Sequence, residues 1–168
     1  MAGIADGGAV SARVTLRPAK QVNLSLIEPW YAEAVSAVHG GAKPEGEQDL
    51  QSRFKSGGLL VIARADDPTP IGLLEQRTGW PVRSWVTVEF IALAAGQRGW
   101  GYGSEAVRQL EERHKGARFL AQIDPRNGLA LYFWLRLGYR PARASEVFWR
   151  APDEGGIIAM IRLPQEME

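Results

Sequence analysis

Three glycines alternate with aromatic residues in the segment 98–104, which reads Arg98-Gly99-Trp100-Gly101-Tyr102-Gly103-Ser104. An apolar run precedes this segment, and helical spacing follows it, so the pattern predicts a strand, a tight loop and a helix that begins at Ser104. A helix start leaves backbone N–H groups without acceptors and carries the positive end of the helix dipole. Glycines let the backbone approach a phosphate, and Arg98 adds a cation. The segment predicts an anion cradle, with a plain flexible loop as the alternative.

The glycine spacing argues against two common nucleotide-binding loops. A dinucleotide-binding fold requires G-x-G-x-x-G, whereas this segment has G-x-G-x-G. The lysine followed by serine or threonine that completes a P-loop is missing as well. We therefore expect a different class of phosphate-bearing ligand.

The loop resembles a known signature. Read as Arg98-x-x-Gly101-x-Gly103, it is similar to the R/Q-x-x-G-x-G/A pattern of the GNAT superfamily of acyl-CoA-dependent N-acetyltransferases. A second block resembles the family's helix beside the pantetheine arm, and it reads Asn127-x-x-Ala130-x-x-Phe133-Trp134-x-x-x-Gly138-Tyr139. An ordinary helix with an asparagine N-cap and a glycine C-cap explains part of this block. The two blocks together extend the resemblance over most of the chain, from Val14 to Leu163.

The resemblance implies that acetyl-CoA is the co-substrate. In the family, backbone N–H groups at the end of a splayed strand bind the pantetheine and the thioester, and the glycine loop binds the pyrophosphate. The residues expected to bind the cofactor are Ile91, Ala92, Leu93, Arg98, Gly99, Trp100, Gly101, Tyr102, Gly103, Ser104, Asn127, Ala130, Phe133 and Trp134.

Glu89 is the candidate catalytic residue. An acceptor amine must lose a proton before it attacks the thioester, because a lysine-like ammonium has a pKa of about 10.4. Glu89 interrupts the apolar run 85–93, and many family members have a glutamate four residues before the position of Leu93. Burial would raise the pKa of this carboxyl toward the range of a general base. A solvated position or a structural ion pair is the alternative interpretation.

The family's usual general acid is replaced. Many members have a tyrosine at the position of Trp134, where its phenol protonates the leaving thiolate, and an indole is far too weak an acid for that role. Tyr132 is predicted to face elsewhere on the helix, and Tyr139 is expected in the core. We expect Trp134 to be a packing wall and the thiolate to take its proton from the ammonium product. The substitution leaves a second hypothesis open, a catalytically weak module that binds or senses acyl-CoA.

The order of predicted elements is β-α-α-β-β-β-α-β-α-β-β, which indicates an α/β (α+β) fold. We expect a GNAT-like mixed, mostly antiparallel sheet of six to seven strands flanked by about four helices. Predicted strands are 14–17, 59–63, 71–75, 85–93, 119–123, 139–141, 146–149 and 157–161, with a turn at 66–70. Predicted helices are 24–38, 46–55, 104–114 and 127–137.

Length and composition restrict the remaining possibilities. The chain has 168 residues and a net charge of +1, with no cysteine and two histidines far apart. We expect a flexible leader (1–12) and one N-acetyltransferase domain (13–168). The small charge and the lack of a long apolar run favour neither nucleic acid nor a membrane as partner. No metal site is expected, and the location is predicted to be cytoplasmic.

The acceptor is expected to be a small-molecule or peptide amine that attacks the thioester directly. No signature in the first half of the chain names it. Four aromatic residues are equally consistent with an acceptor cleft and with packing in the core or its rim, namely Trp30, Tyr31, Trp80 and Trp85. A homodimer is possible.

Overall fold

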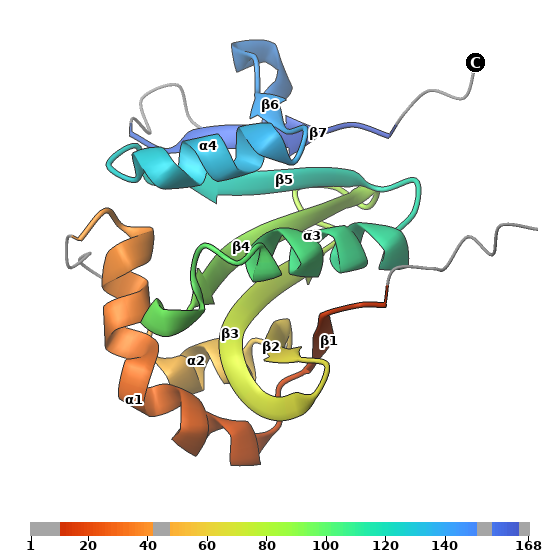
Figure 1. Ribbon diagram of the computed structural model, residues 1–168. Coiled ribbons are helices and arrows are strands. Elements are labelled where there is room, and N and C mark those ends of the chain that lie inside the picture. Colours follow the sequence, from red (N-terminus) through yellow and green to blue (C-terminus); the bar gives the residue numbers. More distant parts are fainter. Residues whose placement is uncertain (1–10, 42–47, 151–155, 165–168) are drawn as a thin grey trace, which may run out of the picture.

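The computed structural model describes residues 11–41, 48–150 and 156–164. A seven-stranded sheet runs through the molecule in the order β1-β2-β3-β4-β5-β7-β6 (Figure 1). Its strands are β1 (Val14–Pro18), β2 (Leu59–Arg64), β3 (Asp67–Thr78), β4 (Trp85–Leu93), β5 (Arg118–Ile123), β6 (Arg140–Pro141) and β7 (Ile158–Arg162). The β4–β5 pair is parallel and the other neighbours are antiparallel, which confirms the predicted mixed sheet.

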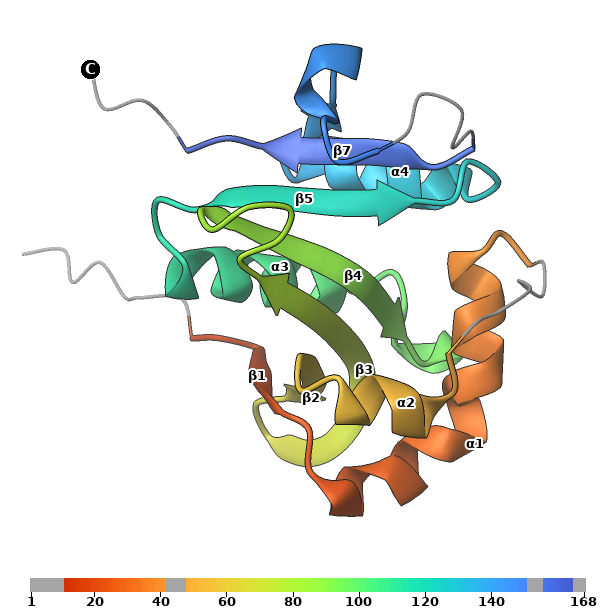
Figure 2. The ribbon, with the colours of Figure 1, turned by 180° about the vertical axis from the view of Figure 1, so that it is seen from behind.

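Four α-helices cover the two faces of the sheet. They are α1 (Gln21–Val38), α2 (Leu50–Lys55), α3 (Tyr102–Arg113) and α4 (Gly128–Arg136), with short 3₁₀ helices η1 (Ala95–Gln97) and η2 (Ala144–Glu146). The helices α3 and α4 lie on one face, and α1 and α2 lie on the other, as the two opposite views show (Figures 1 and 2). The observed order of α-helices and strands is the predicted β-α-α-β-β-β-α-β-α-β-β, and one of the eight predicted strands, 146–149, has no place in it.

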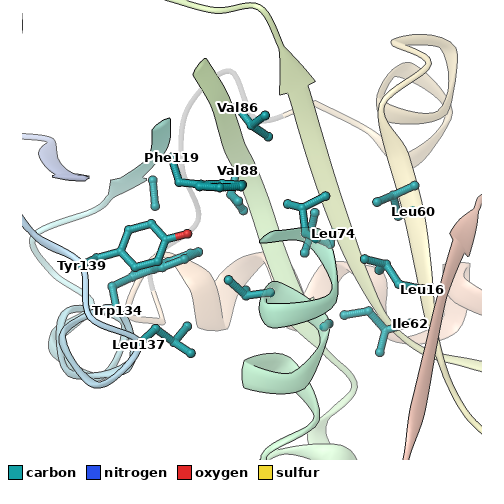
Figure 3. Close-up of a cluster of buried hydrophobic side chains, with 14 of the residues drawn as sticks. Leu16, Leu60, Ile62, Leu74, Val86, Val88, Phe119, Trp134, Leu137 and Tyr139 are labelled. Atoms are coloured by element: carbon teal, nitrogen blue, oxygen red, sulfur yellow. The ribbon is translucent and has the colours of Figure 1, made fainter. Parts of the chain in front are cut away.

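Each face has its own hydrophobic core. Apolar residues of α3 and α4 pack on one face of the sheet, where Leu74, Phe119, Trp134 and Tyr139 are buried together (Figure 3). On the other face, α1 buries a stripe at helical spacing that includes Leu24, Ile27, Tyr31, Ala34 and Val35. Burial of each large apolar side chain contributes about 1.5–3 kcal/mol, so the two cores hold the helices against a single sheet.

The first two helices differ from prediction at their starts. Helix α1 begins at Gln21 and continues through Pro29, which is exposed on the solvent side, where water can satisfy the carbonyl group that loses its partner. Helix α2 begins after Asp49, whose carboxylate accepts a hydrogen bond from the N–H of Ser52 at 2.7 Å. Residues 46–47 of the second predicted helix lie outside the described residues, as do residues 1–10 of the predicted leader.

Two predictions about the strands were wrong. The predicted turn at 66–70 is mostly strand, because β3 already begins at Asp67 and the pairing with β2 shifts register around Ala63, which accommodates the prolines at positions 68 and 70. The predicted strand 146–149 is a 3₁₀ helix followed by a turn. Glu146 there binds the Arg140 guanidinium at 2.9 and 2.8 Å, and this local ion pair replaces strand pairing.

The strands β4 and β5 separate in the middle of the sheet. Their pairing runs from Trp85 opposite Arg118 to Val88 opposite Ala121 and stops there. Beyond Val88, β4 continues along β3 to Leu93, while β5 diverges from it toward the end of the molecule that holds the C-terminal part of α1 (Figures 1 and 2). This separation leaves one edge of β4 open.

Candidate active site

A cleft of about 480 Å³ lies where β4 and β5 separate. The second half of β4 and the glycine loop form one wall, the end of β5 and α4 form the other, and α1 closes one end. Thirteen of the fifteen predicted site residues line it, namely Glu89, Ile91, Ala92, Leu93, Arg98, Gly99, Gly101, Gly103, Ser104, Asn127, Ala130, Phe133 and Trp134.

Trp100 and Tyr102 do not line the cleft. The Trp100 side chain is 65% exposed on the outside of the loop. Tyr102 packs against the core under α3, and the guanidinium carbon of Arg13 lies 5.4 Å from its ring centroid. The alternation of glycine and aromatic residues therefore turns the glycine backbone, but not these two rings, toward the cleft.

The glycine loop has the backbone geometry of an anion cradle. Gly99 and Gly101 both have φ of +83°, a conformation that side chains rarely adopt, and Gly101 is the N-cap residue of α3. Gly103 lies inside the first helical turn, where a Cβ would lie 3.5 Å from the Phe133 ring. The N–H groups of this turn have no acceptor within the helix and are available to a ligand.

Glu105 lies in the same helical turn but points away from the cradle. Its carboxylate accepts hydrogen bonds from the backbone N–H groups of Arg13 and Val14 at 2.7 and 3.2 Å. The Arg13 guanidinium pairs with Glu105 at 3.1 Å and donates to the carbonyl of Trp100 at 2.9 Å. The N-terminal strand thus braces the loop and neutralises a carboxylate that would otherwise repel an anion.

Arg98 connects the glycine loop to α1. Its guanidinium makes a bidentate pair with Glu33 at 2.8 and 2.7 Å, and its Nε donates to the carbonyl of Leu93 at 3.1 Å. The hydrogen bond from Arg98 lowers the pKa of Glu33. Since Arg98 lines the cleft, the predicted cation is at the site, but a carboxylate already neutralises it.

The bond between Arg98 and Leu93 also indicates which backbone groups face the cleft. The Leu93 carbonyl points toward the open edge of β4, and alternate residues of a strand direct their backbone groups to opposite edges. Ile91 and Leu93 therefore present N–H groups to the open edge, while Ala92 pairs with β3.

Glu89 lies in a β-bulge of β4. The pairing with β3 shifts between Glu75 opposite Phe90 and Gln76 opposite Val88, so Glu89 has no opposite residue. Its side chain is 36% exposed, less desolvated than the sequence suggested, and it lines the cleft. Partial burial and then the charge of Glu75 raise the pKa of this carboxyl.

Two arginines oppose that rise in pKa. Arg77 Nη1 lies 3.9 Å from Glu89 Oε1, a loose and exposed contact. Arg53 pairs instead with Glu75 at 2.6 Å and donates to the Tyr31 hydroxyl at 2.7 Å. Its guanidinium carbon also lies 4.0 Å from the centroid of the Phe90 ring. The carboxyl of Glu89 therefore has a raised pKa and remains accessible from the cleft.

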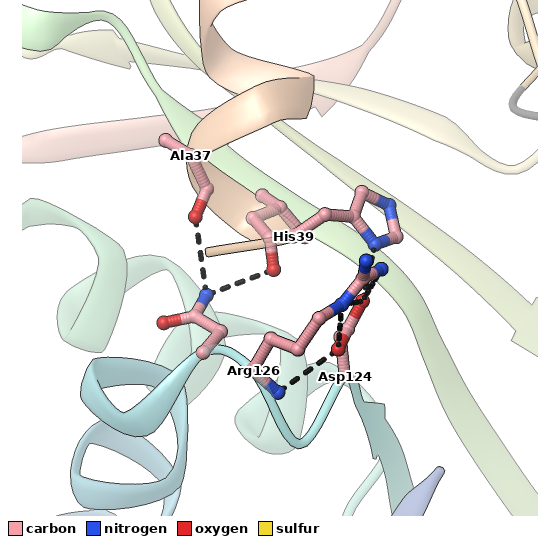
Figure 4. A network of polar contacts seen from close by, with 6 residues as sticks. Ala37, His39, Asp124 and Arg126 are labelled. Atoms are coloured by element: carbon pink, nitrogen blue, oxygen red, sulfur yellow. Dashed lines mark hydrogen bonds and ion pairs between the residues drawn. The ribbon is translucent and has the colours of Figure 1, made fainter. Parts of the chain in front are cut away.

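A polar clasp joins the C-terminal end of α1 to the turn between β5 and α4 (Figure 4). The Asn127 side chain accepts from the Ala130 N–H at 3.0 Å and donates to the carbonyls of Ala37 and Val38 at 3.3 and 2.9 Å. His39 Nδ1 lies 3.0 Å from Asp124 Oδ2. Asn127 thus serves as a helix cap and as a link between the two sides of the cleft.

Asp124 is the centre of the clasp. Arg126 donates to it from the backbone N–H and from Nε, both at 2.9 Å, and His39 contacts it from the end of α1. The hydrogen bonds from Arg126 hold the pKa of the Asp124 carboxyl well below its usual range. The aspartate therefore stays ionised and fixes the turn that precedes α4.

Trp134 is a buried wall of the cleft. Its side chain is 3% exposed and meets Phe133 and Tyr139 edge-on, with ring centroids 5.1 and 4.7 Å apart. Tyr139 is in the core, as predicted, where burial raises its pKa and its hydroxyl has no hydrogen-bond partner among the described residues. No tyrosine occurs among the described residues that line the cleft. These observations fit the interpretation of Trp134 as a packing residue.

Sequence reasoning missed several residues at the site. Arg136 lines the cleft and follows Phe133 by three positions, so the helical spacing of the second motif could have identified it. Gln122 and Asp124 come from the end of β5, and the Asp124-Pro125 turn signal was available. Glu33 pairs with Arg98 across 65 positions, and no local pattern indicates that contact.

The described part of the chain offers neither a cluster of metal ligands nor a membrane span. Within residues 11–41, 48–150 and 156–164, no group of three or more histidine, cysteine, aspartate or glutamate side chains could hold a metal ion. None of the helices in these ranges is long and apolar enough to cross a membrane.

Known proteins share the fold and the sequence pattern. The model of the acetyltransferase (GNAT) family matches residues 25–139. An acetyltransferase from Thermus thermophilus superimposes with a TM-score of 0.69 at 16% identity, covering 90% of this chain and 97% of that one. The PaiA N-acetyltransferase from Thermoplasma acidophilum, in complex with coenzyme A, superimposes with a TM-score of 0.67 at 14% identity, covering 89% of this chain and 98% of that chain.

A third similar structure is the spermidine N-acetyltransferase from Vibrio cholerae in complex with CoA and spermine. Its TM-score is 0.66 at 14% identity, with 91% of this chain and 96% of that chain covered. At these low identities, the three superpositions show a shared fold. A comparison with curated protein sequences found no significant match. The family model covers more than half of the chain, and the sheet and helices agree with the fold of the similar structures, so the chain belongs to the GNAT family of acetyltransferases.

Proposed function

We propose that this protein is an N-acetyltransferase that moves the acetyl group of acetyl-CoA to a primary amine. The main support is one geometric observation: the cleft at the β4–β5 separation holds both the glycine cradle and Glu89. One end of the cleft suits a pyrophosphate, and the other offers a carboxylate with a raised pKa. The reaction class requires that combination.

The residues of the cleft fit the parts of acetyl-CoA. Gly99, Gly101 and the first turn of α3 offer backbone N–H groups to the pyrophosphate, and Arg98 offers a guanidinium. The open edge of β4 and the apolar wall of Phe133 and Trp134 suit the pantetheine arm. When bound, acetyl-CoA supplies an activated acyl group as a thioester.

Glu89 accepts the proton that the acceptor ammonium must lose, directly or through a water molecule. The free amine then attacks the thioester carbonyl, a nitrogen–carbon bond forms and the carbon–sulfur bond breaks. The N–H groups of Ile91 and Leu93 at the open edge of β4 stabilise the developing oxyanion. Since the cleft has no tyrosine among its described residues, the leaving thiolate takes its proton from the ammonium product.

The acceptor is an amine of small-molecule or peptide type. The structure of the similar enzyme from Vibrio cholerae contains spermine, which illustrates a small amine ligand on this fold. Release of free thiol from acetyl-CoA in the presence of an amine panel tests the proposal. Steady turnover with at least one amine is expected. Tight acetyl-CoA binding without turnover on any amine would favour an acyl-CoA-sensing module instead.

A further inference from the structure

Two arginine–glutamate pairs of opposite character lie side by side near the catalytic end of the cleft. Glu75 and Arg77 are two positions apart on β3 and so share one face of the sheet. The Arg53–Glu75 pair is 2.6 Å long, and its side chains are only 9% and 8% exposed. The Arg77–Glu89 pair is 3.9 Å long, and its side chains are 58% and 36% exposed. The first pair is structural, whereas the second is loose and accessible.

The Arg77 guanidinium rests on an aromatic wall. Its central carbon lies 5.1 Å from the centroid of the Trp80 ring. Trp149 packs edge-on against Trp80 and Trp85, with ring centroids 6.0 and 5.9 Å apart. The Thr87 hydroxyl donates to the Trp80 carbonyl at 2.8 Å and fixes the start of this wall to β4. A guanidinium on a packed aromatic ring is held in place without using its N–H donors, and the Arg77 side chain is 58% exposed.

The charges around Glu89 do not suit a polycation. Glu75 and Glu89 are matched by Arg53 and Arg77, so these four residues carry no net charge. An acceptor such as spermine would bring several positive charges next to Arg77, which repels them. A compact acceptor that carries both an amine and a carboxylate is instead complementary: the carboxylate matches Arg77, and the amine matches Glu89.

We propose that Arg77 binds a carboxylate of the acceptor, and that the acceptor is therefore an amino acid or a similar compact amine that carries a carboxylate. The inference rests on the proposed acetyltransferase function. The 3.9 Å separation between Arg77 and Glu89 sets the size of the acceptor, because an amine and a carboxylate only a few bonds apart can reach both side chains. Arg77 is thus a specificity-determining residue.

A bound carboxylate also assists the chemistry. The Arg77 charge lowers the pKa of Glu89 and so weakens it as a base. A carboxylate on Arg77 neutralises that charge and strengthens Glu89 at the moment an acceptor is present. Amines without a carboxylate do not provide this assistance, so we expect them to have a lower kcat as well as a higher KM.

The test compares acceptors that differ only in the carboxylate. Thiol release from acetyl-CoA is measured with phenylalanine, phenylalaninamide, phenethylamine, glycine, glycinamide, β-alanine and spermine. We expect carboxylate-bearing amines to exceed their amides in kcat/KM by about 10- to 100-fold, the effect of a hydrogen-bonded charge pair. Arg77→Gln should remove that preference and leave the KM for acetyl-CoA unchanged. Arg83→Gln, which removes an exposed arginine from the neighbouring turn, is the matched control and should keep the preference.

The outcomes separate this inference from the proposed function. Turnover that favours spermine or the amides in the wild type would overturn the inference and leave the acetyltransferase function intact. An equal loss of kcat/KM on all acceptors in Arg77→Gln would also overturn the inference, because that result would show a general structural role for Arg77. Turnover with none of these amines would overturn the inference, and thiol release with a wider panel that includes peptide amines would then decide the proposed function.

Discussion

The ion pair between Arg98 and Glu33 predicts that Glu33 opposes cofactor binding. Arg98 is the guanidinium beside the glycine cradle, and Glu33 holds two of its donors at 2.8 and 2.7 Å. A pyrophosphate that uses these donors must displace Glu33. Arg98 stays anchored without it, because its Nε donates to the Leu93 carbonyl. Glu33→Gln removes the competing charge with little change in shape, so acetyl-CoA should bind more tightly.

The size of the expected change in the Kd for acetyl-CoA follows from how exposed the Arg98–Glu33 ion pair is. The two side chains are 37% and 52% exposed, so solvent screens the attraction strongly. Ion pairs of this kind contribute about 0.2–1 kcal/mol, and a bidentate geometry favours the upper end. Release of that competition lowers the Kd for acetyl-CoA by a factor of about 1.4–5. The gain should be larger at low ionic strength and shrink as salt is added.

Calorimetric titration of acetyl-CoA into the two proteins measures the effect. Glu28→Gln is the matched control, because it makes the same charge change at an exposed position of the same helix, and it should leave the Kd unchanged. In an Arg98→Ala background, Glu33→Gln should have no effect. An unchanged or higher Kd in the single Glu33→Gln variant would refute the reasoning and show that Glu33 orients Arg98 for the ligand.

Two further predictions concern the loop and the tryptophan. Gly101→Val should raise the Kd for acetyl-CoA and lower stability by about 1–3 kcal/mol, because Gly101 has φ of +83° in the cradle. Gly116→Val is the control, because Gly116 has φ of +82° and open space around it. It should lower stability by a similar amount in thermal unfolding without changing the Kd. Equal Kd values for the two variants would exclude this loop as the cradle. Trp134→Tyr should weaken acetyl-CoA binding and lower stability by about 1–2 kcal/mol, because the ring is 3% exposed and a smaller one leaves a gap. A gain in kcat with unchanged affinity would show that thiolate protonation limits the reaction and that Trp134 is not only a wall.

Sequence reasoning identified the features that local patterns encode. The strand 85–93 was predicted with its observed bounds, because apolar and β-branched residues dominate that run. The glycine loop was predicted directly before a helix, and Gly101 in that loop has a positive φ, which glycine adopts without strain. Gly103 does not need the same freedom, because α3 begins at Tyr102, two residues earlier than expected.

The features that were missed depend on contacts between distant parts of the chain. Asn127 was recognised as a helix cap, but its bonds to α1 span about 90 positions, and nothing in the local pattern predicts them. The bulge at Glu89 arises from the pairing with β3 and changes how far the carboxylate is buried. Trp149 was assigned to a strand because of its apolar neighbours, whereas its packing on Trp80 and Trp85 decides the structure there.

The most direct test of the proposed function is the pH dependence of thiol release in the wild type and in Glu89→Gln. If Glu89 removes the amine proton, wild-type kcat/KM falls as the pH drops through its raised pKa, because protonation removes the base. Glu89→Gln should lower kcat by about 10²–10⁴, lose this acidic limb and keep its affinity for acetyl-CoA. A Glu89→Gln variant with wild-type kcat and an unchanged pH profile would contradict the proposed mechanism.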